Sequence, residues 1–269
     1  MANRLILCDD TYINNNDIEY SKYLTPQAKT YVGVEIDPSK VHQLIDDIKT
    51  LRTAFNLPEE VTSFHFTDLY CKRKYWKDPD ENKLETINRI FEMFTILFEK
   101  YQVETFLQTV ESYTPVKGAE WPKGFLGKQQ STKEGTAFYL MVYNAIKNCQ
   151  SGDQIVFLVE EGELGKPKQV YKYKWNGVLI AFYFYPKTYE PLQFADFVAF
   201  MITRAKIITL KNTMNYMDEN IFMPLYERIS VAINSKQVIK SYVPQTKHLK
   251  GSVEEVLEID RKSKGLSAL

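Results

Sequence analysis

One run near the C-terminal third, PLQFADFVAFMITRA at residues 191–205, restricts the fold more than any other segment. The run predicts a helix that is apolar on nearly every side and is therefore buried. A single carboxylate, Asp196, lies within it. An unpaired buried carboxylate costs on the order of several kcal/mol or takes up a proton, so a donor, a cation or a metal ion has to satisfy it. Pro191 suits the first helical position, so Asp196 falls past the cap, and both a structural hydrogen bond and a metal-ligand role stay open.

Strand-like apolar runs alternate with helical periodicity along the chain, which predicts an α/β fold: a mixed β-sheet flanked by helices. The predicted strands are residues 5–8, 31–36, 61–66, 103–110 and 155–159, and then a hairpin of 169–175 and 178–185 around Asn176-Gly177. One predicted helix begins at Asp37-Pro38. Further helices are predicted at 84–99, at 132–149, over the 191–205 run and around 215–230, and a long loop is predicted at 113–130. We expect an α/β domain at residues 1–212 and extra C-terminal helices at 213–269 that end in a partly flexible tail.

Composition narrows the class of protein. A chain of 269 residues with 44% hydrophobic side chains can bury a large core, and its formal net charge of zero gives no composition-level argument for nucleic acid or membrane. The few, widely spaced cysteines at 8, 71 and 149 predict reduced thiols in the cytoplasm. We find no signal-peptide pattern and no apolar run of the ~18 residues that span a bilayer. We also find no P-loop and no G-x-G-x-x-G, and we expect no small-molecule cofactor.

Several acids follow predicted strands directly: Asp9, Asp10, Asp68, Glu111, Glu160 and Glu161. Ligand sites of α/β sheets gather at the carboxyl ends of strands, and Mg²⁺ and Mn²⁺ prefer carboxylate oxygens. Two such ions ~3.5–4 Å apart can clamp the attacking and leaving oxygens of a phosphodiester. The alternative is a set of solvated acids in turns, which are common after strands. Asp9 and Asp196 stand out because each borders deeply apolar sequence.

The order of these motifs resembles the family called domain of unknown function 3800, whose members look like ribonuclease H-fold proteins of bacteria and their mobile elements. The resemblance covers roughly residues 4–212. LILCDDT matches the opening strand and acidic turn at Asp9, SFHFTDLY matches a middle motif E-x-H-x-x-D at His65 and Asp68, and IVFLVEE matches a later strand ending in an acid. The strongest element is PLQFADFVAF, which is similar to the closing helix pattern LQLADLVA at Gln193 and Asp196.

The resemblance implies a ribonuclease H-like fold and metal-assisted hydrolysis of a phosphodiester by water. Asp9, Glu160 and Asp196 would hold Mg²⁺ or Mn²⁺, with Asp10 as a further ligand, and His65 would orient a water or phosphate. Asp68, Glu111 and Glu161 are second-tier acids. The sequence departs from the pattern at Ser63, which replaces Glu, at Asp10, which also replaces Glu, and at Tyr185-Pro186-Lys187, which lacks an expected Asp-Ser step.

A basic segment follows the middle motif, with Lys72, Arg73 and Lys74 next to Trp76. Cations interleaved with aromatic rings suit phosphate contacts and base stacking, although a solvated basic loop has the same composition. Three interpretations therefore stand: a metal-dependent nuclease, a catalytically inactive ribonuclease H-like binding or scaffold protein, and an interaction protein whose exposed aromatic side chains form a homodimer face.

Overall fold

The computed structural model describes residues 2–12, 29–110, 133–161, 166, 168, 170–211 and 213–234. Its strands are β1 (Asn3–Tyr12), β2 (Lys29–Ile36), β3 (Glu104–Val110), β4 (Gln154–Glu160), β5 (Val170–Trp175) and β6 (Val178–Tyr185). Its longer helices are α1 (Val41–Ala54), α3 (Glu81–Tyr101), α4 (Lys133–Ile146), α5 (Glu190–Lys211) and α6 (Met223–Asn234). Short helical turns are η2 (Pro38–Lys40), α2 (Phe66–Tyr70), η3 (Lys74–Trp76) and η5 (Asp218–Phe222).

The six described strands form one mixed sheet in the order β3-β2-β1-β4-β6-β5. The pairs β1–β2, β2–β3 and β5–β6 are antiparallel, whereas β4 runs parallel to both β1 and β6. Asn176 and Gly177 turn the chain from β5 to β6 with positive φ angles of 48° and 82°, as a two-residue hairpin turn requires. The predicted α/β class and the predicted hairpin are both confirmed. Because β1, β4 and β6 run in the same direction, their carboxyl ends lie at the same end of the sheet.

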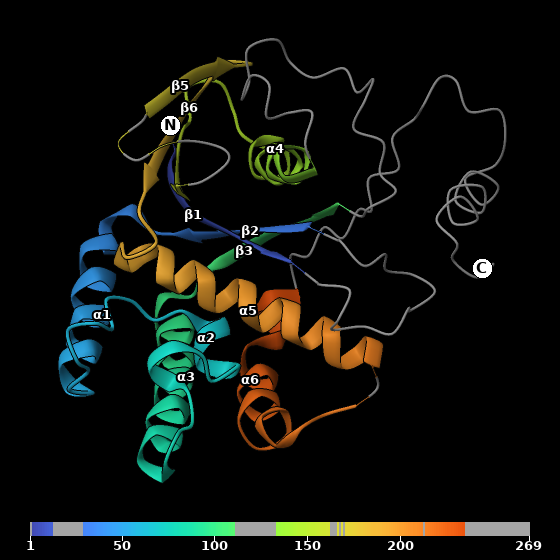
Figure 1. The fold of residues 1–269 in the computed structure, drawn as a ribbon. Helices are drawn as coiled ribbons and strands as arrows, with labels where there is room; N and C mark the ends of the chain where they lie inside the picture. The colour runs from blue at the N-terminus through green and yellow to red at the C-terminus, as the bar shows by residue number, and fades with distance from the viewer. Residues whose placement is uncertain are drawn as a thin grey trace, which may run out of the picture.

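Helices cover both faces of this sheet (Figure 1). Helix α4 lies on one face, and α5 crosses the other, with α1, α2 and α3 beyond it and α6 contacting both α5 and β3. Strand alternation divides β1 between the two cores: Leu5 and Leu7 point to the α5 side, whereas Ile6 and Cys8 point to the α4 side. A residue's parity along β1 therefore decides which helical layer it meets.

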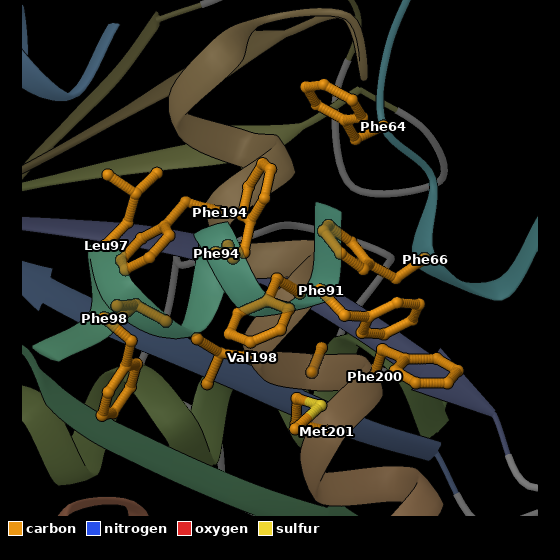
Figure 2. Packing of buried hydrophobic residues seen from close by; sticks show 14 of the residues in the cluster. Phe64, Phe66, Phe91, Phe94, Leu97, Phe98, Phe194, Val198, Phe200 and Met201 are labelled. Atoms are coloured by element: carbon orange, nitrogen blue, oxygen red, sulfur yellow. The ribbon is translucent and has the colours of Figure 1, made fainter. Parts of the chain in front are cut away.

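Aromatic rings from three segments make up the centre of the α5-side core (Figure 2). Phe66 contacts Phe91, Phe94 and Phe197 edge-on, with ring centroids 5.1, 4.8 and 5.0 Å apart. Edge-to-face pairs of this kind add ~0.5–1.5 kcal/mol each beyond the burial of their area. Because Phe66 comes from a segment far from α3 and α5 in sequence, these contacts fix that segment against both helices.

The segment 61–66, predicted as a strand, is not one. Its backbone N–H groups at Phe64 and Phe66 donate to side chains of α5, to Gln193 Oε1 and Asp196 Oδ2, both at 2.9 Å. Because these donors are satisfied by side chains, the segment does not pair with a neighbouring strand. The apolar alternation of 61–66 reflects burial of an extended segment between helices.

A buried ion pair ties the chain after α5 to the main body. Asp218 is fully buried and accepts hydrogen bonds from Arg204 Nε at 2.7 Å, Arg204 Nη2 at 2.5 Å and Tyr70 Oη at 2.6 Å. Burial alone would raise the pKa of Asp218, but these donors outweigh it and leave the pKa below its usual value. The η5–α6 segment, which also packs on α3, is thus attached to α5 and α2. The predicted domain boundary at residue 212 stays a prediction, and 235–269 lie outside the described residues.

Candidate functional site

Two of the predicted acids lie side by side on the α5 face of the sheet. The parallel register pairs Cys8 of β1 with Val159 of β4, so Asp9 and Glu160 follow at the same level. By strand alternation both share the face of Leu7 and Leu158, which belong to the α5-side core. Sequence-distant acids therefore meet because parallel strands end together.

Helix α5 contributes the third acid. Asp196 is 7% exposed and interacts electrostatically with Asp9, and α5 packs directly on β1. One Asp196 oxygen accepts the Phe66 N–H, so a backbone donor satisfies part of this buried carboxylate. We call Asp9, Glu160 and Asp196 the acid cluster.

Asp9 is the most constrained member of the acid cluster. It is 3% exposed, and its Oδ2 is buried without a hydrogen-bond partner. Burial raises the pKa of Asp9 well above its usual value, and the neighbouring carboxyl groups of Asp196 and Glu160 raise it further. The Glu160 carboxyl group acts on Asp9 from the neighbouring parallel strand. A buried, underpartnered carboxyl of this kind is characteristic of sites prepared for a ligand.

Lys187, which sequence reasoning did not select, lies against the acid cluster. Its Nζ is 3.4 Å from Glu160 Oε2, and it also interacts electrostatically with Asp196 and Asp9. Burial lowers the pKa of Lys187, but the three carboxyl groups outweigh burial and leave its pKa raised. The signal that could have found it is its position directly after β6, the strand that is parallel to β4 and ends at the same edge.

The Gln-x-x-Asp spacing of α5 has a structural role as well. Gln193 accepts the Phe64 N–H and donates from Nε2 to the Thr188 carbonyl at 3.0 Å, while Asp196 accepts the Phe66 N–H. Residues three apart lie on the same face of a helix, so one face of α5 binds two alternate N–H groups of an extended segment. In this way the LQFAD run of α5 holds the backbone of residues Phe64 to Phe66, which we call the FHF segment.

A pocket of about 260 Å³ opens next to that segment, lined by Glu60, Val61, Thr62, Ser63, His65, Asp68, Lys74, Tyr75 and Trp76. His65 caps α2 by accepting the Asp68 N–H at Nδ1, 3.3 Å away. Lys74 Nζ is 2.6 Å from Asp68 Oδ2. His65 and Asp68 thus face this pocket, and Phe66, the next residue after His65, donates its N–H to Asp196 of the acid cluster.

The other predicted acids that the structure describes, Asp10, Asp68 and Glu161, lie outside the acid cluster. Asp10 is next to Asp9 but points to the α4 side, where it forms an ion pair with Lys29. Glu161 follows β4, donates its N–H to the Tyr185 carbonyl at 2.8 Å, and has a buried Oε2 without a hydrogen-bond partner. Glu111 and the loop predicted at 113–130 lie outside the described residues.

The basic segment is only partly as predicted. Arg73 and Lys74 are exposed and Lys72 is half-buried, with positive φ angles of 53° at Lys72 and 55° at Lys74. Trp76, in contrast, is 4% exposed and packs in the α5-side core. In this structure η3 turns the Trp76 ring largely inward, although Trp76 also lines the pocket, and base stacking on it stays a prediction.

The chemistry of the acid cluster fits a hard divalent cation, since its donors are carboxylate oxygens and one of them is buried without a partner. Yet among the described residues no group of three or more His, Cys, Asp or Glu side chains is spaced as a ready-made ligand shell. The acids interact across the site, and the cation beside them is the ammonium of Lys187.

Comparison with protein families, curated proteins and solved structures gave no match. Within the part of the chain that the structure describes, no helix has the length and apolar character needed to cross a bilayer.

Proposed function

We propose that this protein is a ribonuclease H-like, divalent-metal-dependent phosphodiesterase acting on nucleic acid. The observation that carries the proposal is the meeting of Asp9, Glu160 and Asp196, from two parallel strands and a crossing helix, with Asp9 Oδ2 buried and unpartnered. Support for the fold comes from the mixed sheet with helices on both faces and acids at the ends of its parallel strands. No match to another protein contributes to this proposal.

In this proposal Asp9, Glu160 and Asp196 hold the metal. Bound Mg²⁺ or Mn²⁺ would supply charge stabilisation and an activated water at neutral pH. The chain's own contribution is to exclude water around Asp9, which is buried, and to orient Asp196 through the Phe66 N–H. His65 and Lys74, which line the adjacent pocket, would contact the phosphate backbone together with the exposed Arg73.

The experiment combines metal binding with cleavage. Mn²⁺ is titrated calorimetrically into the wild type, Asp9→Asn and Asp196→Asn, and all three are incubated with single- and double-stranded DNA and RNA. We expect Mn²⁺ binding and cleavage in the wild type and loss of both in the variants. Asp10→Asn is the matched control, because Asp10 is adjacent in sequence but faces the other side of the sheet. A wild type that binds no Mn²⁺ and cleaves none of these substrates refutes the proposal.

A second candidate function is an inactive binding or scaffold protein of the same fold. The specific observation in its favour is Lys187, a side-chain cation already placed at the carboxylates that a metal would need. Nucleic-acid binding that persists in EDTA and is unchanged by Asp9→Asn, without cleavage, would favour this candidate.

A further inference from the structure

The interaction of Lys187 with all three acids has no role in the proposed hydrolysis. Its ammonium lies near Glu160 and acts electrostatically on Asp196 and Asp9. An ammonium and a divalent ion that seek the same carboxylate oxygens compete for them, since each satisfies the same negative charge.

We propose that Lys187 is a built-in counter-cation that occupies the acid cluster until a divalent metal ion displaces it. This inference rests on the metal site of the proposed function. It makes Lys187 a determinant of metal affinity: the ammonium stabilises the carboxylates in the metal-free protein, and it turns towards solvent when the ion binds.

Three features support displacement over permanent occupancy. Lys187 lies in the turn between β6 and α5, and its side chain is 35% exposed, so it can leave without opening the core. Lysine has a long, flexible stem, and its ammonium readily exchanges protein partners for water. The ammonium contacts Glu160, whereas Asp9 Oδ2 stays unpartnered, so the most buried oxygen of the acid cluster is not used by Lys187.

The test measures Mn²⁺ affinity by calorimetry in the wild type, Lys187→Met, Lys187→Arg and Lys100→Met. Lys100 is the matched control because it pairs with an aspartate, Asp47, at 2.5 Å elsewhere in the fold. We expect Lys187→Met to bind Mn²⁺ at least tenfold more tightly than the wild type. Lys187→Arg should bind no more tightly than the wild type, and Lys100→Met should match it.

The outcomes separate this inference from the proposed function. Equal or weaker binding by Lys187→Met, or no binding by any of these proteins, overturns the counter-cation role. If only Lys187→Met binds Mn²⁺, the counter-cation role stands and the proposed hydrolase activity of the wild type falls. If the wild type binds without any gain in Lys187→Met, the proposed function survives and the inference does not.

A measurement on the wild type protects the test against a variant that fails to fold. Lysine acetylation by an N-hydroxysuccinimide ester is followed by mass spectrometry in EDTA and in saturating Mn²⁺. Displacement predicts faster labelling of Lys187 in Mn²⁺, with Lys100 unchanged as internal control. An unchanged or slower rate at Lys187 refutes displacement.

Discussion

Replacing Asp9 by Asn should stabilise this protein at neutral and alkaline pH. Asp9 is buried at 3% exposure, has an oxygen without a partner, and faces two other carboxyl groups. A buried unsatisfied polar group costs ~1–3 kcal/mol, and more when it is charged. Asparagine keeps the shape, removes the charge and carries an N–H that can donate to the neighbouring carboxyl groups. We therefore expect a gain of roughly 1–3 kcal/mol in the free energy of unfolding at pH 8.

The pH dependence follows from the direction of the shift. Burial raises the pKa of Asp9 in the folded state above the unfolded value of about 3.9. Between the two pKa values the folded state holds more protons than the unfolded state, so stability falls as pH rises through this window. The loss is at most ~1.4 kcal/mol for each pH unit from this one group. Below the unfolded pKa the group is protonated in both states, and the advantage of asparagine should shrink.

Urea denaturation followed by circular dichroism at pH 4, 6 and 8, with EDTA present, measures both effects. The difference in unfolding free energy between Asp9→Asn and the wild type should grow with pH. Asp10→Asn is the matched control, and it should not stabilise the protein because it breaks the ion pair with Lys29. Equal stability of Asp9→Asn and the wild type at pH 8, or a difference that does not vary with pH, would refute the reasoning.

Three further predictions concern the supports of the site. Arg204→Met should destabilise the protein by ~3–5 kcal/mol in urea denaturation, because it leaves buried Asp218 uncompensated, and a loss below ~1 kcal/mol would contradict this. Gln193→Leu should speed hydrogen exchange of the Phe64 amide, because its N–H loses its acceptor and the free energy of opening falls by ~1–3 kcal/mol. An unchanged exchange rate at Phe64 would contradict this prediction. Arg73→Ala should weaken nucleic-acid binding and reduce its salt slope by about one, as fluorescence anisotropy at several salt concentrations can show, and an unaltered slope would exclude a phosphate contact there.

Local patterns predicted much of the fold because each depends on a short window of sequence. The periodicity of α3 and the Asn176-Gly177 turn both correspond to elements of the structure. The segment 61–66 shows where such patterns fail, since its apolar alternation matched a strand while its N–H groups bind Gln193 and Asp196. Alternation reports burial on one side and gives no information about which acceptor completes the backbone.

The candidate site was predictable to a similar degree. Asp9 and Glu160 could be selected because both end apolar runs, and the parallel register then sets them level. The contacts of Lys187 and the inward turn of Trp76 depend on tertiary neighbours, so the sequence pattern did not single out Lys187 and suggested an exposed ring at Trp76. The sequence gives the charge of each side chain, but the alignment of strands and helices decides which residue that side chain contacts.

Asp196 serves the acid cluster and the FHF segment at the same time, with one oxygen committed to the Phe66 N–H. The next residue along that segment towards the N-terminus, His65, borders the pocket that contains Lys74. One hydrogen bond therefore connects the backbone beside the pocket to a carboxylate of the acid cluster. If a ligand at one place changes the geometry of this bond and so the affinity at the other, reciprocity requires that the effect be equal in both directions.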